Sequence, residues 1–325
     1  MRCWPTRTDY NEAMQSHDLT LVDPTLKKCK LELTTSGTPV FASGRFAVVY
    51  DLRNGGDRIA LRAFLTENLD RKERLDEIAK HLNGNRPAGP VGFNYYQQGI
   101  HAPPVYACFP IQTLDWVDGD RMDVWLTDRV RARDAGAIRK LADHWVELMD
   151  SLLERQIAHG DLQHGNILIK NNQPWLIDYD CMCVPNLVGR PATEDGLPGY
   201  QHPNRPGQPL SLDLDHFSAW VVLVALRAIA ADTTLHDRYV TRCNLENTLF
   251  AGSDFKPVTA DERSRADALW TELLRSQDPD VREWARLLQK AAEGPYDQVP
   301  PCRFNHLEPL RKLAEQKPPD WDTIL

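Results

Sequence analysis

The stretch HGDLQHGNILIKNNQPWLIDYD, residues 159–180, contains side-chain oxygen atoms suited to hold a divalent metal ion. Asp161 and Asn166 lie five positions apart in a polar segment, and Asp178 follows a short apolar run. Carboxylate and amide oxygens are hard ligands of the kind that hold Mg²⁺ together with water and substrate phosphates. We therefore expect this stretch to be the chemical centre of the chain.

The apolar runs in this stretch predict a β-hairpin. Residues 167–169 and 175–177 are short apolar runs, and residues 170–174, Lys-Asn-Asn-Gln-Pro, separate them. Two short strands that flank an Asn-rich turn must fold back on each other. The hairpin would bring the three oxygen-bearing side chains close together at one end of the two strands.

The same stretch resembles the catalytic core of the protein kinases, in the form of a bacterial protein-kinase-like domain with atypical motifs. HGDLQHGN is similar to the H-R-D-x-x-x-x-N motif of the catalytic loop, and DYD is similar to D-F-G. The resemblance implies that Asp161 accepts the proton of an attacking hydroxyl and that Asn166 and Asp178 hold Mg²⁺. Asp180 replaces the D-F-G glycine, which leaves two interpretations: a further metal ligand, or a solvated loop charge.

Composition and charge favour an ordinary globular protein over a nucleic-acid-binding or membrane-binding one. The 325 residues are enough to bury a substantial core in one large or two modest domains. The net charge of −8 does not indicate a surface for nucleic acid or an anionic membrane. Seven cysteines are scattered along the chain, and Cys181 and Cys183 are too close for a CxxC pair. The N-terminus has no apolar stretch typical of a signal peptide, so we expect reduced thiols and a cytoplasmic location.

Residues 40–64 predict strands around a glycine turn. The runs VFASGRFAVVY and RIALRAF are rich in β-forming residues, and Asn54-Gly55-Gly56 lies between them. The first run is similar to the kinase glycine-rich loop, with alanine in place of two glycines and the middle one retained. Small residues let backbone N–H groups approach phosphate oxygens, although ordinary turn chemistry is the alternative. By resemblance, the loop residues expected to contact ATP are Gly44, Phe46, Ala47 and Val49.

The second run carries the expected phosphate cation. The lysine of the kinase V-A-I-K motif bridges the α- and β-phosphates and pairs with a helix glutamate. IALR places Ala60 and Arg62 in the corresponding positions. Arginine keeps the positive charge of the lysine, but its planar guanidinium cannot take the place of a compact ammonium without moving the phosphates or the partner. We therefore expect nucleotide binding to persist while phosphoryl transfer slows or stops. A helix predicted over residues 70–82 offers two candidate partners for the cation, Glu73 and Glu77, and a Pro- and Gly-rich cluster at 86–92 would end it.

The segment VYACFPIQTLDWV, residues 105–117, predicts strands that end at a turn. By resemblance it is the hinge between the kinase lobes, whose backbone would meet the adenine ring. An ordinary core strand is the alternative interpretation. The residues expected around the adenine are Leu114, Asp115 and Val117.

Amphipathic and apolar helices follow. Residues 134–155 have the spacing of one apolar helix face and run directly into the catalytic loop. Residues 217–230 are strongly apolar but carry Arg227 and are shorter than a membrane span, so we expect a buried core helix. Tyr200 to Pro203 resemble the end of a kinase activation segment. Asp215 resembles the residue that ties down the kinase catalytic loop, and a helix cap is the alternative.

These patterns predict an α+β, bilobal protein-kinase-like fold with a small antiparallel-sheet N-lobe, one helix in that lobe, and a larger, mostly helical C-lobe. The expected divisions are an N-terminal extension (1–30), the N-lobe (31–117), the C-lobe (118–294) and a C-terminal tail (295–325).

The expected function is ATP- and Mg²⁺-dependent phosphoryl transfer to Ser or Thr of a protein. Gly160 replaces the arginine that reads activation-loop phosphate, and Gln163 replaces a lysine that aids the transferred phosphate. One alternative is a pseudokinase that binds nucleotide or acts as a scaffold for a regulatory partner protein. Another is a small-molecule kinase of the aminoglycoside-phosphotransferase kind, which shares HGD-x-x-x-x-N. The expected partner is a protein substrate or regulatory protein, not a nucleic acid or a membrane, and the sequence does not indicate an oligomeric state.

Overall fold

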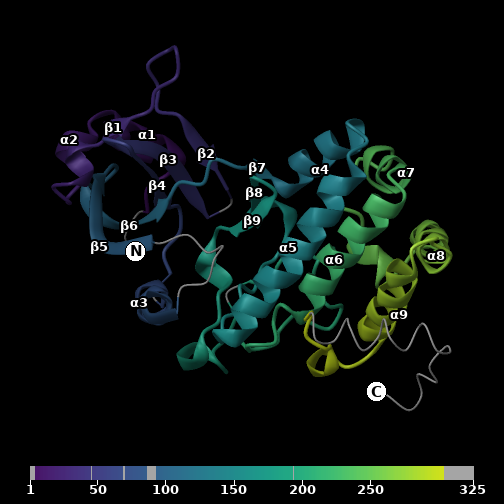
Figure 1. The fold of residues 1–325 in the computed structure, drawn as a ribbon. Coiled ribbons are helices and arrows are strands. Elements are labelled where there is room, and N and C mark those ends of the chain that lie inside the picture. Colours follow the sequence, from purple (N-terminus) through teal and green to yellow (C-terminus); the bar gives the residue numbers. More distant parts are fainter. Residues whose placement is uncertain (1–3, 45, 69, 86–92, 193, 304–325) are drawn as a thin grey trace. The chain divides into compact units, whose positions relative to one another are not determined.

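The computed structural model describes residues 4–44, 46–68, 70–85, 93–192 and 194–303 (Figure 1). The chain forms two compact units. The first consists of Met1–Gly84 and Val91–Asp118, and the second of Asn85–Pro90 and Gly119–Leu325. The Pro- and Gly-rich cluster at 86–92 and most of the expected C-terminal tail lie outside the described residues.

The first unit is built on an antiparallel sheet. The described strands run in the order β1-β3-β4-β6-β5, and β2 also pairs with β3. They are β1 (Lys30–Leu31), β2 (Phe41–Ser43), β3 (Ala47–Asn54), β4 (Asp57–Phe64), β5 (Phe93–Ala102) and β6 (Ala107–Asp115). The predicted glycine turn joins β3 to β4, and Gly55 has a φ of +61°, which glycine adopts without a steric penalty.

The N-terminal residues pack on one face of this sheet. α1 (Arg7–Gln15) begins at a capping box in which Thr6 and Asp9 exchange hydrogen bonds, and α2 (His17–Thr20) and η1 (Leu26–Lys28) follow. Tyr10, Met14 and Leu21 lie in the same buried cluster as the sheet residues Val48, Tyr50, Leu52, Leu61, Ala63, Phe109 and Ile111. Residues 4–30 therefore contribute to the core of the first unit. The remaining helix of this unit is α3 (Arg71–Asn85).

A three-stranded sheet carries the predicted hairpin in the second unit. β7 (Asp120–Arg121) pairs with β8 (Ile167–Lys170), which pairs with β9 (Gln173–Leu176). The hairpin is confirmed, but its turn is shorter than predicted. Only Asn171 and Asn172 form it, with φ of +54° and +60°, as in a type I′ turn. Pro174 lies in β9, an edge strand that tolerates a missing N–H.

Helices form most of the second unit. They are α4 (Met122–Arg131), α5 (Ala135–Glu154), α6 (His216–Ala231), α7 (Thr234–His236) with η5 (Asp237–Thr241), α8 (Ala260–Leu274) and α9 (Pro279–Glu293). Short turns of helix lie at η2 (His164–Asn166), η3 (Tyr179–Cys181), η4 (Pro185–Leu187), η6 (Gly252–Asp254) and η7 (Tyr296–Gln298). α5 and α6 lie side by side (Figure 1), and Trp145 donates from Nε1 to the carbonyl of Ala219 at 3.0 Å.

α6 is the buried core helix that the sequence predicts. Its residues from Phe217 to Ala230 are all buried. Arg227 is accommodated because it donates to Asp280 at 2.9 Å and forms ion pairs with Asp143 and Asp278. Within the described ranges, no helix alone has the length and apolar character of a membrane span. Only α6 and residues 234–241 taken together meet that test, and the pair is bent by 116°.

A substitution in the N-terminal segment tests whether it belongs to the core of the first unit. Met14 is fully buried, so we expect Met14→Ala to lower the free energy of unfolding by about 2–5 kcal/mol through the lost contacts and the cavity left behind. Leu19 is 75% exposed and provides the control, Leu19→Ala, for which we expect a change within about 0.5 kcal/mol. Urea denaturation measures both. Equal effects of the two substitutions would contradict this role of the segment.

Candidate active site

Asp215 anchors the loop that contains the predicted catalytic residues. Its Oδ2 accepts a hydrogen bond from the backbone N–H of His159, and its Oδ1 accepts one from that of Gly160 at 2.8 Å. The side chain does not cap α6, which it precedes. The interpretation that Asp215 ties down the catalytic loop is therefore confirmed.

Gly160 occupies a position in this loop that has no room for a side chain. Its φ of +81° is left-handed, and a Cβ atom at this position would collide with the carbonyl oxygen of Cys181. The side chain of His159 adds a second tie, with Nε2 at 2.9 Å from the carbonyl oxygen of Ile177. The arginine that resemblance leads one to expect after His159 has no space here.

The structure brings Asp161, Asn166 and Asp178 together. Asn166 donates from Nδ2 to Oδ2 of Asp161 at 2.8 Å and to its carbonyl oxygen at 3.0 Å. Asp178 follows β9, where the backbone N–H of Ile177 donates to the carbonyl of Asn166 at 3.0 Å. The carboxylate of Asp178 is close enough to Asp161 to raise its pKa. The hairpin thus delivers all three side chains to one place, as the sequence predicts.

The electrostatics of Asp161 are those of a buried acid. Burial has the largest effect and raises its pKa. The neighbouring His159 lowers it, Asp178 raises it, and hydrogen bonds from the Asn166 side chain and the Leu197 backbone lower it. Its Oδ1 is buried, and the backbone of Leu197 lies close enough to the carboxylate to lower its pKa. A buried carboxylate is stabilised by each hydrogen-bond donor that reaches it.

The oxygen set fits a hard divalent cation. Mg²⁺ is commonly held by one or two carboxylates together with substrate phosphates and water, so Asn166 and Asp178 would suffice as protein ligands. Over the described ranges, no three His, Cys, Asp or Glu side chains converge as a metal cage built from protein alone would require. Asp180 lies half-buried in η3, and its role as a further ligand stays a prediction.

In the first unit, the sheet register gathers most of the predicted nucleotide-binding residues on one face. Val49 and Gln112 lie directly opposite Arg62, and Ala60 lies opposite Leu114. Directly opposed residues of antiparallel strands point to the same face. The members of the predicted set on this face are Ala47, Val49, Ala60, Arg62 and Leu114.

The other predicted nucleotide-binding residues lie in loops or contribute backbone. Gly44 donates its backbone N–H to the carbonyl of Ala47 at 3.0 Å, in the turn between β2 and β3, and Phe46 lies in the same turn. Asp115 ends β6, where it pairs with Ile59, and Val117 follows that strand. Their contacts with adenine or phosphate stay predictions.

Arg62 is a buried cation on this face. It is 7% exposed, and its Nη1 lies 3.5 Å from Oε1 of Gln112. Its guanidinium is 5.5 Å from the ring centre of Phe64. The carbonyl of Phe64 accepts hydrogen bonds from Trp4 and Tyr10, so the N-terminal segment fixes the end of the strand that carries Arg62.

The choice between Glu73 and Glu77 as the partner of this cation stays open. Lys80 donates to Glu77 at 2.6 Å, and the side chain of Glu77 is 17% exposed. Glu73 lies in the first turn of the same helix.

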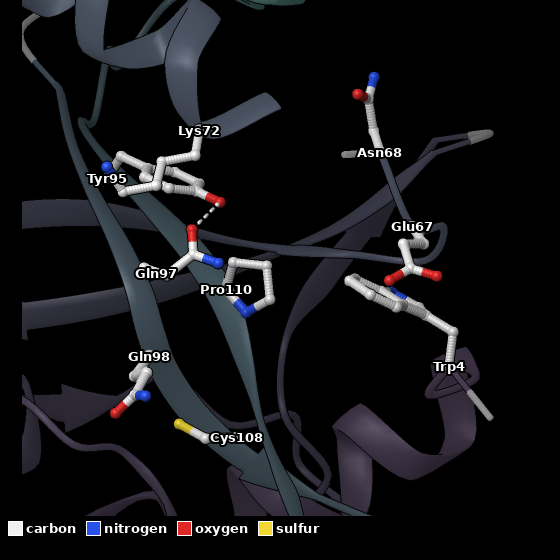
Figure 2. A pocket seen from close by; sticks show the side chains of 9 residues that line it. All are labelled: Trp4, Glu67, Asn68, Lys72, Tyr95, Gln97, Gln98, Cys108 and Pro110. Atoms are coloured by element: carbon white, nitrogen blue, oxygen red, sulfur yellow. Dashed lines mark hydrogen bonds between the residues drawn. The ribbon is translucent and has the colours of Figure 1, made fainter. Parts of the chain in front are cut away.

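A pocket of about 240 Å³ lies near the end of β4 in the first unit (Figure 2). It is lined by Trp4, Glu67, Asn68, Lys72, Tyr95, Gln97, Gln98, Cys108 and Pro110. None of the predicted nucleotide-binding residues is part of this lining.

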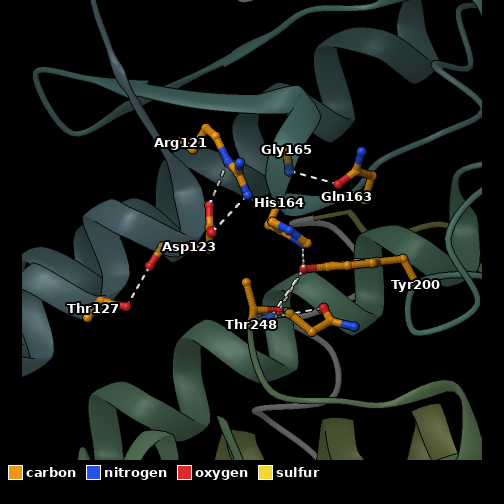
Figure 3. A network of polar contacts seen from close by, with 9 residues as sticks. Arg121, Asp123, Thr127, Gln163, His164, Gly165, Tyr200 and Thr248 are labelled. Atoms are coloured by element: carbon orange, nitrogen blue, oxygen red, sulfur yellow. Dashed lines mark hydrogen bonds and ion pairs between the residues drawn. The ribbon is translucent and has the colours of Figure 1, made fainter. Parts of the chain in front are cut away.

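Sequence reasoning missed a polar network that joins the catalytic loop to the end of the predicted activation segment (Figure 3). Nδ1 of His164 lies 3.1 Å from the hydroxyl oxygen of Tyr200, and that hydroxyl donates to Thr248 at 3.3 Å. Tyr200 is fully buried, and burial lowers the pKa of His164. No local pattern points to Thr248, because the contact joins residues 48 positions apart.

Comparison with known proteins gives two matches. Residues 108–188, which include the catalytic loop and Asp178, match a family described as the phosphotransferase enzyme family. Among solved structures, the kinase PK-1 of Cydia pomonella granulovirus is similar, with a TM-score of 0.50 and 15% identity, over 85% of this chain and 94% of that chain. No curated protein matches significantly. The predicted bilobal α+β, protein-kinase-like fold is therefore confirmed, and the family match supports a phosphotransferase.

Replacing Asp215 tests the anchor of the catalytic loop. Asp215→Asn leaves one acceptor for two backbone N–H donors, so we expect the free energy of unfolding to fall by about 1–3 kcal/mol. The control is Asp213→Asn, because the Asp213 side chain is 60% exposed. Urea denaturation of both variants is the measurement. A loss in the control as large as that in Asp215→Asn would contradict the anchoring role.

Proposed function

We propose that the chain is an ATP- and Mg²⁺-dependent phosphotransferase that acts on the hydroxyl of a protein Ser or Thr. The observation that carries this proposal is the buried carboxylate of Asp161. Asn166 donates to one of its oxygens, and burial raises the pKa of the carboxyl. Such a carboxylate is suited to accept the proton of an attacking hydroxyl.

In the proposed reaction, the acceptor oxygen forms a bond to the γ-phosphorus while its proton passes to Asp161. The bond from this phosphorus to the bridging oxygen breaks, and ADP leaves with the electron pair. Asn166 and Asp178 would hold Mg²⁺, which supplies positive charge to the phosphates. Asp215 contributes by keeping the backbone of the catalytic loop in one conformation, because phosphoryl transfer depends mainly on positioning.

The first unit would supply the nucleotide contacts. Arg62 is a buried cation among small and apolar side chains, an environment that strengthens its attraction for phosphate. Arginine is suited to grip two phosphate oxygens through its planar fork, where a lysine offers one compact charge. This cation therefore supports nucleotide binding with a geometry different from that of a lysine.

A small-molecule hydroxyl is the second candidate acceptor. The match to the phosphotransferase family over residues 108–188 favours it. So does Gln163, whose side-chain oxygen accepts from the backbone N–H of Gly165 at 2.7 Å and brings no cation to the loop. The resemblance of Tyr200 to Pro203 to the end of a kinase activation segment and the anchoring by Asp215 favour the protein acceptor.

Transfer of label from ATP tests the proposed function. The full chain is incubated with Mg²⁺ and γ-labelled ATP, with myelin basic protein or kanamycin as the acceptor. We expect transfer by the wild type, loss of transfer with EDTA, and a fall of about 100-fold or more in Asp161→Ala, because a general base typically contributes that much.

The acceptor that becomes labelled decides between protein and small-molecule substrates. If neither is labelled and no ADP forms while ATP raises the melting temperature, the chain is a nucleotide-binding pseudokinase.

Nucleotide affinity tests the role of Arg62. We expect Arg62→Met to weaken ATP binding about tenfold or more, because a hydrogen bond to a charged group contributes about 1.5–3 kcal/mol. Arg53→Met is the matched control, since the side chain of Arg53 on β3 is 48% exposed and pairs with Glu32. Isothermal titration calorimetry measures both affinities. Equal affinities for wild type and Arg62→Met would remove Arg62 from the nucleotide site.

A further inference from the structure

Arg58 connects the sheet of the first unit to the residues that follow β6. Its Nε donates to Oδ1 of Asp51 on β3 at 3.0 Å, and its Nη2 donates to Oδ2 of the same carboxylate at 2.6 Å. Its Nη1 donates to Asp118, and its guanidinium lies 4.1 Å from the ring centre of Trp116. Two edges and one face of this planar group therefore contact three other residues.

The contact with Asp51 is the one that fixes the guanidinium. The side chain of Asp51 is 2% exposed, whereas that of Asp118 is 63% exposed. A bidentate pair between arginine and a carboxylate is defined in geometry as well as in charge, and an exposed ion pair contributes little by itself. Trp116 and Asp118 therefore take their positions from Arg58, which takes its own from the sheet.

Arg58 lies on the face of the sheet that carries most of the predicted nucleotide-binding residues. It precedes Ala60 by two positions and Arg62 by four on β4, and Asp51 lies directly opposite Ala60. Side chains two positions apart in a strand point to the same face. The row thus begins with Arg62, the expected phosphate cation, and ends with Arg58 beside the residues that follow β6.

The contacts of Arg58 act on the residues expected to meet adenine. The backbone N–H of Trp116 donates to the carbonyl of Arg58 at 3.0 Å, so the backbone of Trp116 faces β4. Backbone groups of successive strand residues face opposite edges, so those of Asp115, which ends β6, face away from β4. Val117 lies between Trp116 and Asp118, which both contact the guanidinium. The position of the backbone at 115–117 therefore depends on Arg58.

We propose that Arg58 is a positioning residue that fixes residues 115–118 for the recognition of adenine. Arg58 does not itself contact the base in this proposal. The 6-amino group of adenine donates a hydrogen bond where the 6-oxygen of guanine accepts one, so backbone groups held in one position distinguish ATP from GTP. This inference rests on the proposed function, because it assigns the choice of nucleotide in the same site.

The ratio of the affinities for ATP and GTP separates positioning from general stability. Both nucleotides carry the same phosphates, which Arg62 and Mg²⁺ would bind in either case. If residues 115–118 lose their fixed position, the bonds to adenine weaken and GTP is little affected. A general loss of stability in the first unit would weaken both nucleotides together and leave the ratio unchanged.

The test uses two variants and a matched control. Arg58→Lys keeps a positive charge beside buried Asp51, but one ammonium cannot serve two carboxylates and an indole ring in the geometry of the guanidinium. Trp116→Leu leaves the pair of Arg58 and Asp51 intact, so it decides the question if Arg58→Lys does not fold. The control is Arg53→Lys, because Arg53 lies directly opposite Arg58 on β3, is 48% exposed and pairs with Glu32.

Isothermal titration calorimetry of the full chain gives Kd for MgATP and MgGTP, and thermal unfolding without nucleotide shows which variants are folded. We expect the wild type to bind MgATP about tenfold or more tightly than MgGTP. This ratio should fall about fivefold in Arg58→Lys and in Trp116→Leu, while Kd for MgGTP stays within about twofold, since one hydrogen bond of this kind is worth about that factor. Arg53→Lys should keep the ratio of the wild type.

Two results would overturn the inference alone. One is a wild type that binds MgATP and MgGTP equally well, and the other is a ratio that stays the same in both variants. If the wild type binds neither nucleotide, the proposed function fails and the inference fails with it. If the wild type selects ATP but transfers no phosphate, the proposed function fails at the transfer step, and a lowered ratio in the variants still supports the role of Arg58.

Discussion

The buried carboxylate of Asp215 is the interaction on which the second unit depends. It accepts two backbone N–H groups from consecutive residues, His159 and Gly160, and so fixes the chain immediately before Asp161. Burial raises the pKa of Asp215, while the charge of His159 and the two backbone donors lower it. The carboxylate is stable in its buried place because the loop supplies these donors, and the loop keeps its shape because the carboxylate collects them. The buried carboxylate and the conformation of the loop therefore stabilise each other.

A different constraint organises the first unit. Alternation along β4 sends Leu61 and Ala63 into the core beneath α1 and sends Ala60 and Arg62 to the opposite face. Burial of the N-terminal segment on the first face thus determines where the cation stands on the second. The hydrogen bonds from Trp4 and Tyr10 to the end of β4 give the same segment a direct hold on that strand.

Local sequence patterns were sufficient to predict the elements that are formed by neighbouring residues. The Asn-Asn pair and the flanking apolar runs predicted the hairpin, and the Gly-Gly pair predicted the turn between β3 and β4. Pro174 was misassigned to the turn because a proline signal does not reveal that the strand is an edge strand. Two contacts could not be predicted from the sequence: the approach of Gln201 to Asp161 and the contact of Tyr200 with Thr248. Both join segments that are distant in the sequence, and no local spacing of residues indicates such a contact.

One departure from the kinase motifs in the catalytic loop, Gly160 in place of an arginine, has a physical cause. The chain after Asp178 packs so closely on the loop that the carbonyl of Cys181 occupies the space where a side chain at residue 160 would begin. An arginine that reads activation-loop phosphate therefore has no place, and the ordered state of this segment must come from other contacts. The buried bonds of Tyr200 to His164 and Thr248 provide them without a phosphate. These contacts lie inside the protein, and residues 159–166 contain no arginine or lysine, so we expect the segment to keep its order without phosphorylation.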